Sequence, residues 1–261
     1  MHAQIVSASA IQPNLGAAGV VLPGDSLTVL NARQAAGCDI IAMWSTNQVA
    51  GFTQLAFPSG HDTTRGYRAG ASIGINPAML PLGQTIAVTP QELLSITIAG
   101  SNVAADVENM SMLLWYGDFP GIDARLITSS QLESRIEKYT TIETSIVSAA
   151  GPGYSGEVTI TTSSDLLMAN RDYAIMGISS RTACHALTVR GPDLGNVRLG
   201  CPGVLRQELT SQWFVMLSRA IGKPMIPVFS SGNKSQTLVG VATDENAGTF
   251  LTTLYLALLK K

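Results

Sequence analysis

Two segments of the sequence share one pattern about half a chain apart. The stretch "CDIIAMWSTNQVAGF" begins at Cys38, and "RDYAIMGISSRTACH" begins at Arg171, an offset of 133 positions. Each has an aspartate, a short apolar run that ends in methionine, small polar residues and a second apolar run. An internal repeat constrains the architecture more than any other feature, because both copies are expected to take up the same fold.

A second match lies near the end of each half. The stretch "VENMSMLLWYG" resembles "DENAGTFLTTLYLAL", so that Asn109 matches Asn246 and Tyr116 matches Tyr255. In both places an acidic-Asn turn is followed by a closing run that contains aromatic residues. Two matches in the same order, at nearly the same offset, favour duplication. We therefore predict two similar halves.

Short β-type runs occur throughout both halves. In the segment 157–162, Val158 and Ile160 alternate with threonines, the period-two pattern of a strand with one buried face. Turns rich in Gly, Pro, Asn, Asp and Ser separate the runs, which predicts an all-β sandwich or barrel. The runs are 27–30, 39–44, 49–57, 95–100, 110–116, 157–162, 173–178, 185–190, 212–217, 225–229, 237–242 and 250–259.

One segment near the middle of the chain has a helical pattern. In "SSQLESRIEKYTTIE", Ser130 and Glu133 have the spacing of a capping box. Leu132, Ile136 and Tyr139 follow a spacing that lines one helical face. We expect a short helical connector between two β domains.

These patterns divide the chain into four segments. The first is an N-terminal arm at 1–24, whose weak patterning is also typical of a disordered tail. A first β domain at 25–127, the connector at 128–150 and a second β domain at 151–261 follow.

The composition is poor in charge. Hydrophobic residues make up 46% of the chain and charged residues 13%, about half the usual charged share of a soluble protein. A chain with so few charges is expected to cover much of its surface with other protein. The net charge of −2 argues against a strongly basic nucleic-acid binder. The composition therefore indicates a subunit of an assembly.

The sequence shows no catalytic or cofactor-binding signature in the structural context that such a motif requires. It contains no GxxxxGK[ST] phosphate loop. The pattern GxSxG occurs once, as "GASIG" at 70–74, and GxGxxG once, as "GPGYSG" at 151–156, but neither stands between a predicted strand and a predicted helix. "GPGYSG" precedes a β-type run and is interpreted as a turn. Its three cysteines have no CxxC spacing, and His61 beside Asp62 is interpreted as a turn. His185 lies in an alternating run and is expected to be a partly buried strand residue. We predict no catalytic residue, no metal site, no cofactor and no small-molecule substrate.

Each half has about 100 residues and enough runs for a jelly roll, nominally eight strands in two facing sheets. Two tandem jelly rolls with a short helical connector resemble the double jelly-roll major capsid proteins of icosahedral, often membrane-containing, DNA viruses. The resemblance rests on length, duplication, strand density and low charge over roughly residues 20–261, and on no motif.

The resemblance implies a structural virion protein that is made in the host cytoplasm. Its expected form is a homotrimer whose six jelly rolls make a pseudo-hexagonal block in an icosahedral shell. Further expected partners are neighbouring trimers, minor capsid proteins, and an internal membrane or genome. The residues expected to support the fold and its contacts are Asp39, Asp172, Trp115, Tyr116, Tyr255, Leu132, Ile136 and Tyr139.

Two other functions remain open at this point. A tandem β-sandwich could bind carbohydrate or a host receptor, as in a phage spike or fibre. Exposed loop aromatics would favour that function, whereas Trp44, Trp115 and Trp213 lie in strand-like runs. A hydrolase or cupin-like enzyme on a β scaffold is the other, which three histidines support poorly.

Overall fold

Most of the regular structure is antiparallel β-sheet, which confirms the all-β class. The computed structural model describes residues 1–11, 17–18, 20–21, 37–47, 52–60, 67–69, 74–76, 85–99, 107–117, 122–148, 153–160, 167–182, 184–203, 207–243 and 247–261. The predicted run 27–30 and the pair His61-Asp62 lie outside these residues. The described strands form one six-stranded, one five-stranded and two four-stranded sheets.

The first half contains ten described strands. They are β1 (His2–Ile11), β2 (Ala17–Ala18), β3 (Val20–Val21), β4 (Cys38–Asn47), β5 (Phe52–Ala56), β6 (Tyr67–Ala69), β7 (Gly74–Asn76), β8 (Ile86–Val88), β9 (Ser95–Ala99) and β10 (Val107–Tyr116).

The second half contains the described α-helices and the remaining strands. They are β11 (Leu126–Ile127), α1 (Ser129–Arg135), β12 (Ile136–Ser148), β13 (Gly153–Thr159), β14 (Asp172–Ser180), β15 (Ala186–Arg190), β16 (Leu199–Pro202), α2 (Gln207–Thr210), α3 (Trp213–Ile221), β17 (Ile226–Ser230), β18 (Leu238–Thr243) and β19 (Gly248–Leu259).

The two halves have the same strand order. In the first half, the larger sheet contains the order β1-β10-β4 with β8 also paired to β4, and the smaller sheet is β2-β9-β5-β6. In the second half, the corresponding orders are β12-β19-β14-β17 and β13-β18-β15-β16. Each strand thus has a counterpart at the same place in the chain order, while β3, β7 and β11 are additional short strands. This agreement supports the predicted duplication.

The halves also share a β-bulge at the same place. Along β10 and β4, the pair Leu113–Ala42 is followed by Leu114–Ile40, which leaves Ile41 as an extra residue. Along β19 and β14, the pair Tyr255–Gly177 is followed by Leu256–Ile175, which leaves Met176 extra. A bulge at a fixed place in a sheet is a designed feature of a fold family. It therefore gives a residue-by-residue alignment of the halves.

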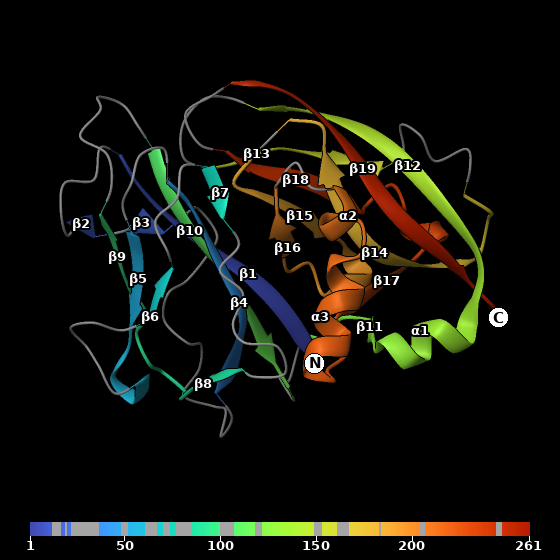
Figure 1. Cartoon of the computed structure of the whole chain (residues 1–261). Helices are drawn as coiled ribbons and strands as arrows, with labels where there is room; N and C mark the ends of the chain where they lie inside the picture. The colour runs from blue at the N-terminus through green and yellow to red at the C-terminus, as the bar shows by residue number, and fades with distance from the viewer. Residues whose placement is uncertain are drawn as a thin grey trace.

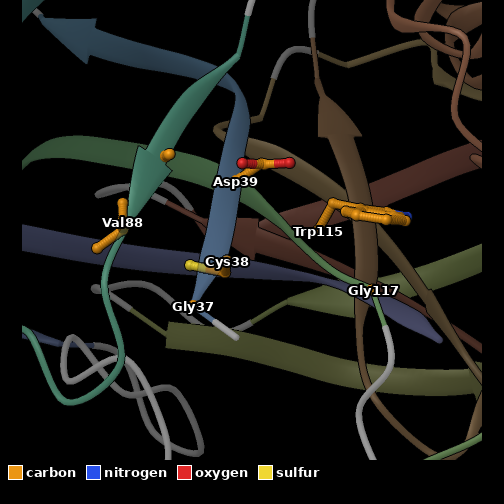
Figure 2. Close-up of a pocket in the computed structure, with 7 residues that line it drawn as sticks. Gly37, Cys38, Asp39, Val88, Trp115 and Gly117 are labelled. Atoms are coloured by element: carbon orange, nitrogen blue, oxygen red, sulfur yellow. The ribbon is translucent and has the colours of Figure 1, made fainter. Parts of the chain in front are cut away.

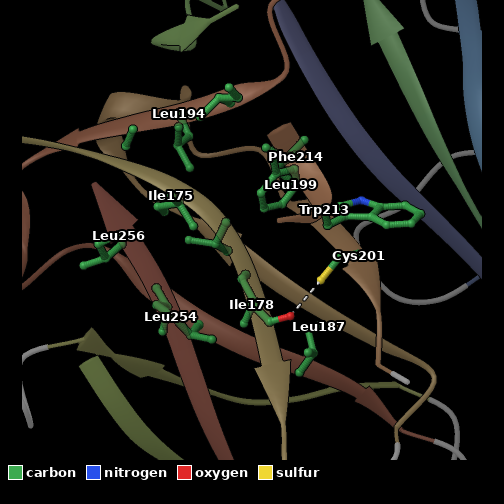
Figure 3. Packing of buried hydrophobic residues seen from close by; sticks show 14 of the residues in the cluster. Ile175, Ile178, Leu187, Leu194, Leu199, Cys201, Trp213, Phe214, Leu254 and Leu256 are labelled. Carbon is green, nitrogen blue, oxygen red and sulfur yellow. Dashed lines mark hydrogen bonds between the residues drawn. The ribbon is translucent and has the colours of Figure 1, made fainter. Parts of the chain in front are cut away.

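Each half has its own core between its two sheets. In the first half, Val6, Met110 and Met112 of the larger sheet pack with Leu55 and Ile98 of the smaller one. In the second half, Figure 3 shows Ile178 and Leu254 facing Leu187, with Cys201 beside them. Burial raises the pKa of the Cys201 thiol, which donates a hydrogen bond to the Ile178 carbonyl oxygen at 3.5 Å.

The larger sheet of the first half is buried on both faces. Its outward face, away from its own sandwich, carries Ala3, Ile5, Ala42, Trp44 and Leu113, each at most 2% exposed. These residues belong to the same hydrophobic cluster as the core of the second half. In Figure 1, β1 and β4 run between the halves, beside β16 and α3. The chain therefore packs as two sandwiches side by side.

The N-terminal segment is not an arm. Instead of lying outside the core, residues 2–11 form β1, which pairs along its full length with β10. The side chains of β1 alternate between the first-half core and the second half, so the strand is buried on both faces. The polarity alternation on which strand prediction depends is therefore missing from the stretch "AQIVSASA". The exact domain boundaries stay predictions.

The predicted helical connector is mostly a strand. The helix α1 ends at Arg135, and its capping box joins Thr128 and Gln131 rather than Ser130 and Glu133. From Ile136 onward the chain forms β12, with every second residue from Ile142 to Ser148 buried. β-Branched threonines and isoleucines with period-two burial favour the strand, and pairing with β19 stabilises it.

The run predicted as a strand at 212–217 is a helix. It forms α3, which buries Trp213, Phe214 and Leu217. A short continuous apolar run does not distinguish a strand from a buried helix. Gly222 follows in the left-handed conformation, with φ of 67°, and its N–H donates to the Ser218 carbonyl. A glycine just after the last turn commonly ends a helix, so Gly222 was the sequence signal that indicated a helix here.

We predict that Gly177→Ala destabilises the protein by about 1–3 kcal/mol, the usual cost of overpacking. A Cβ at Gly177 would lie 1.9 Å from the Thr210 carbonyl oxygen, where the turn after α2 rests on β14. Gly153→Ala is the matched control, because nothing lies within 4 Å of its Cβ position. Urea unfolding measures both; equal stabilities would contradict the described packing of α2 on β14.

Candidate assembly interface

The edge of β1 docks on β16 of the second half. The Ile5 N–H donates to the Arg198 carbonyl oxygen at 2.9 Å, just before β16 begins. A Cβ at Gly200 would lie 2.6 Å from the Ile5 Cδ1 atom, so the backbone of β16 approaches β1 closely where glycine leaves room. The contact joins the first-half sheet to the second half through one main-chain hydrogen bond and close packing.

A row of buried polar side chains crosses between the halves. The Tyr154 hydroxyl of β13 donates to Ser7 Oγ of β1 at 3.0 Å, and Ser7 Oγ lies 2.6 Å from Ser111 Oγ of β10. Ser111 Oγ lies 2.6 Å from His185 Nε2, at the start of the loop into β15. The Tyr154–Ser7 and Ser111–His185 contacts cross between the halves, whereas Ser7 and Ser111 both belong to the first-half sheet. Because the two crossing contacts hold buried polar atoms, the row fixes the register of the halves.

His185 is a neutral histidine within this row. Its side chain is fully buried, and burial lowers its pKa to about 3 by removing solvent from the imidazolium form. A serine and a histidine in hydrogen-bond contact are also the basis of nucleophilic catalysis. Here Ser111 and His185 are both 0% exposed, so no substrate reaches them. The pair acts as a structural contact.

Trp44 links the same region to α3. Its Nε1–H donates to the His185 carbonyl oxygen at 3.0 Å. Its ring meets Trp213 edge to face, with centroids 5.9 Å apart and planes at 81°. An aromatic pair of this geometry contributes about 0.5–1.5 kcal/mol beyond its buried area. Trp44 therefore connects the first sheet both to the second-half backbone and to its helix.

A cation joins the halves at the other end of the outward face. Lys223 Nζ lies 2.7 Å from Asp39 Oδ2 and 3.8 Å from the centroid of the Trp115 ring. Figure 2 shows Asp39 on β4 beside Trp115 on β10, which are opposite each other in the register. The sequence thus predicted two members of this contact and missed the third, because Lys223 is distant in the chain.

Asp39 and Trp115 also line a cleft of about 380 Å³, together with Cys38 and Val88. Burial, together with the neighbouring Asp39 and Glu92 carboxylates, raises the pKa of the Cys38 thiol to about 12. The thiol is therefore protonated at neutral pH, and a protonated thiol is a poor nucleophile. The cleft has no activated cysteine.

Arg198 is held in place by its neighbours. Glu157 accepts a hydrogen bond from Arg198 Nε at 2.9 Å and also pairs with Arg190. The Arg198 guanidinium lies 4.4 Å from the Tyr154 ring centroid. These contacts position the Arg198 carbonyl that accepts the Ile5 N–H, so the cluster supports the junction between the halves.

Asp172 does not share the role of Asp39. It pairs with Arg125, whose NH1 atom lies 3.3 Å from Asp172 Oδ1 and 3.4 Å from Asp193 Oδ1. Asp193 also accepts the Ser230 N–H at 2.9 Å, so this cluster secures the entry of the chain into the second half. Both aspartates lie at the start of corresponding strands, but in the alignment set by the bulge the counterpart of Asp39 is Ala174 and not Asp172.

The two closing-strand tyrosines also lie on different faces. Tyr116 points into the first-half core and stacks on His2 with centroids 4.6 Å apart. Tyr255 lies on the outward face of the second half, with its hydroxyl 3.2 Å from Ser179 Oγ. Their similarity in sequence does not reflect equivalent positions, because the bulge makes Leu113 the counterpart of Tyr255.

The three residues predicted as a helical face lie together, although only one is helical. Leu132 is in α1, whereas Ile136 and Tyr139 belong to β12. They line a groove of about 410 Å³ with Met176 of β14 and Val215 of α3. The groove lies on the outward side of the second half.

Within the described ranges, no three His, Cys, Asp or Glu side chains are grouped as ligands of one metal ion. The described helices are short, and none has the length and apolar composition of a membrane-spanning segment.

Comparisons with known proteins give limited likeness. No family model matches the sequence, and no curated protein sequence matches it. The PBSX exported protein XepA is similar in structure over 97% of this chain and 86% of XepA, with 10% identity and a TM-score of 0.29. The STIV MCP is similar over 98% of this chain and 86% of that chain, with 9% identity and a TM-score of 0.21. Neither likeness identifies the fold at these TM-scores.

We predict that Trp44→Phe costs about 1–3 kcal/mol, because it removes the closer of two donors to the buried His185 carbonyl and leaves only the Gly203 N–H at 3.5 Å. Trp213→Phe is the matched control, because its Nε1 atom is buried with no partner among the described residues. The control should cost less than Trp44→Phe or be neutral. Chemical unfolding of both variants measures the difference, and a costlier Trp213→Phe would contradict the described contact.

We predict that His185 makes stability depend on pH in the acid range. Its folded-state pKa of about 3 is below the unfolded value near 6.5, so between these values the unfolded state binds more protons. Stability is therefore complete above pH ~6.5 and falls toward pH ~3, by about 1.4 kcal/mol per pH unit for one proton.

The measurement is urea unfolding of the wild type and His185→Gln at several pH values. The variant should lack this part of the slope, while His2, with a pKa of about 4, contributes equally to both proteins. Parallel pH profiles would show that His185 is not buried as described.

Proposed function

We propose that the protein is a structural subunit of two tandem jelly rolls that works by self-assembly. The support for the fold is the strand order. A jelly roll has eight strands in two facing sheets. Each half offers eight corresponding strands in two sheets of the same order, with an extra residue at Ile41 and Met176 on corresponding strands.

One observation carries the functional part of the proposal. The outward face of the first-half sheet is apolar and is buried against the second half, with Ile5, Trp44 and Leu113 all at 0% exposure. The flank of one sandwich thus forms an interface with the other sandwich of the same chain. A fold whose flanks pack against like units needs few surface charges, in agreement with a charged fraction of 13%.

The assembly that fits best is a viral shell. In this proposal the chain is a major capsid subunit, a homotrimer of six jelly rolls that packs against neighbouring trimers, and closed symmetry completes the shell. Minor capsid proteins and an internal membrane or genome are its further partners in the virion. The subunit is made in the host cytoplasm, performs no catalysis and holds no cofactor.

We predict that the purified full-length chain forms trimers or larger assemblies. Native mass spectrometry gives the number of copies, and negative-stain microscopy shows whether the assemblies have threefold outlines or form closed shells. A chain that stays monomeric at every concentration tested would contradict the proposal. A monomer whose melting temperature rises with an added oligosaccharide would favour a carbohydrate-binding module instead.

A further inference from the structure

The shared bulge allows the outward faces of the two halves to be compared residue by residue. The pair Leu113–Ala42 corresponds to Tyr255–Gly177, and the registers of β1 with β10 and of β12 with β19 extend the comparison. The corresponding residues are Ala3 and Tyr139, Ile5 and Thr141, Ser7 and Glu143, Leu113 and Tyr255, and Ile41 and Met176.

These two faces have opposite surroundings. The first-half members are buried, because the second half covers them. In the second half, Tyr139 is 61% exposed, Thr141 and Glu143 are exposed, and Met176 and Tyr255 are half-buried. We call these five residues the β12 face. The turn after α2 covers Gly177 beside it and the outward residues of β19 are half-buried or buried, but β12 is exposed at Tyr139, Thr141 and Glu143.

The outer edge of β12 corresponds to the edge of β1 that contacts the second half. In the first half, Ile5 uses its N–H to bind the Arg198 carbonyl of the neighbouring sandwich. Thr141 occupies the corresponding position on β12, the outermost strand of its described sheet. Alternate residues of an antiparallel strand direct their N–H groups to the same edge. The matching register therefore places the Thr141 N–H on the outer edge.

Apolar surface is concentrated beside this edge. Val147 is exposed near the far end of β12, on the same side as Tyr139. The groove next to Tyr139 is lined by Ile136, Met176 and Val215, and the Glu133–Arg219 ion pair, at 2.6 Å, lies at it. An apolar centre with a charged pair beside it has the composition of a protein interface.

We propose that the β12 face is the docking surface for a second copy of this chain, joined head to tail. The inference rests on the proposed function and adds the surface and the partner. We choose a second copy as the partner because of the equivalent face in the first half. That face is covered, within the chain, by the second half, which has the same strand order. The counterpart of the covering strand β16 is β6, so the first half of the second copy is the part that docks.

Head-to-tail contact of this kind is heterologous, and it forms a closed ring when the rotation between successive copies divides a full turn. In such a ring every outward face would be covered. The second half covers the face of the first half within each chain, and the next copy covers the β12 face. The β12 edge would then be protected from uncontrolled pairing, which exposed strand edges otherwise invite.

The first test compares Tyr139→Asp with Met168→Asp. Met168 is an apolar side chain of similar exposure, 54%, that lies outside the β12 face. Native mass spectrometry over a dilution series should show the Tyr139 variant dissociating at concentrations roughly tenfold or more above those of wild type, as expected for a central aromatic contact. Met168→Asp should assemble like the wild type. Circular dichroism checks that both variants are folded.

The outcomes separate this inference from the proposed function. If the wild type is monomeric, the proposed function fails and the β12 face has no second copy to bind. If the wild type assembles and both variants assemble equally, the β12 face is not the contact, while the self-assembly proposal stands.

The second test does not depend on a disruptive variant. A photo-reactive phenylalanine derivative replaces Tyr139, and light and isotopically heavy copies are mixed before irradiation. Cross-links from position 139 to β6, or to the neighbouring β5, of a differently labelled copy are expected. Cross-links from position 139 to β12 of the other copy would show a two-fold contact and overturn the head-to-tail arrangement.

Discussion

The structure depends on one sheet that is buried on both faces. The strands β1, β10 and β4 supply half of the first sandwich core and, through their other face, part of the core of the second half. A sheet in this position has no solvent face, so its small and apolar side chains, its neutral His185 contact and its low charge share one cause. Removing water from this face is also the main source of the stability that joins the halves.

The same constraint decides what could be read from the sequence. Runs around β4, β10, β14 and β19 were placed correctly. β12 was assigned to the helical connector, although its residues beyond Ile142 alternate as expected for a strand with one exposed face. β1 was missed because burial on both faces removes the polarity pattern. α3 was assigned to a strand because its run from Trp213 to Leu217 is apolar throughout. Strand pairing decided β1 and tertiary packing decided α3, so local preference decided neither segment.

Trp115, Asp39 and Tyr139 were chosen from the sequence because aromatic and acidic residues stand out in strand-like runs, and their role in assembly stays a prediction. Which residues of the two halves are equivalent could not be predicted, because their alignment depends on a bulge for which the sequence has no signal. An offset that matches Asp39 with Asp172 is shifted from the register in which Asp39 corresponds to Ala174. Lys223, Ser111 and His185 join the site only through long-range packing, so no local signal identified them.

The direct test of this account is native-state hydrogen exchange as a function of denaturant. If the doubly buried sheet joins the halves, the amides of β1 and β4 open in the same unfolding event as those of β15 and β16, with one free energy and one denaturant dependence. The Ile5 amide, bound to the Arg198 carbonyl, should follow this common curve. If the first-half amides exchange through a separate opening of lower free energy, the halves are independent and the account is wrong.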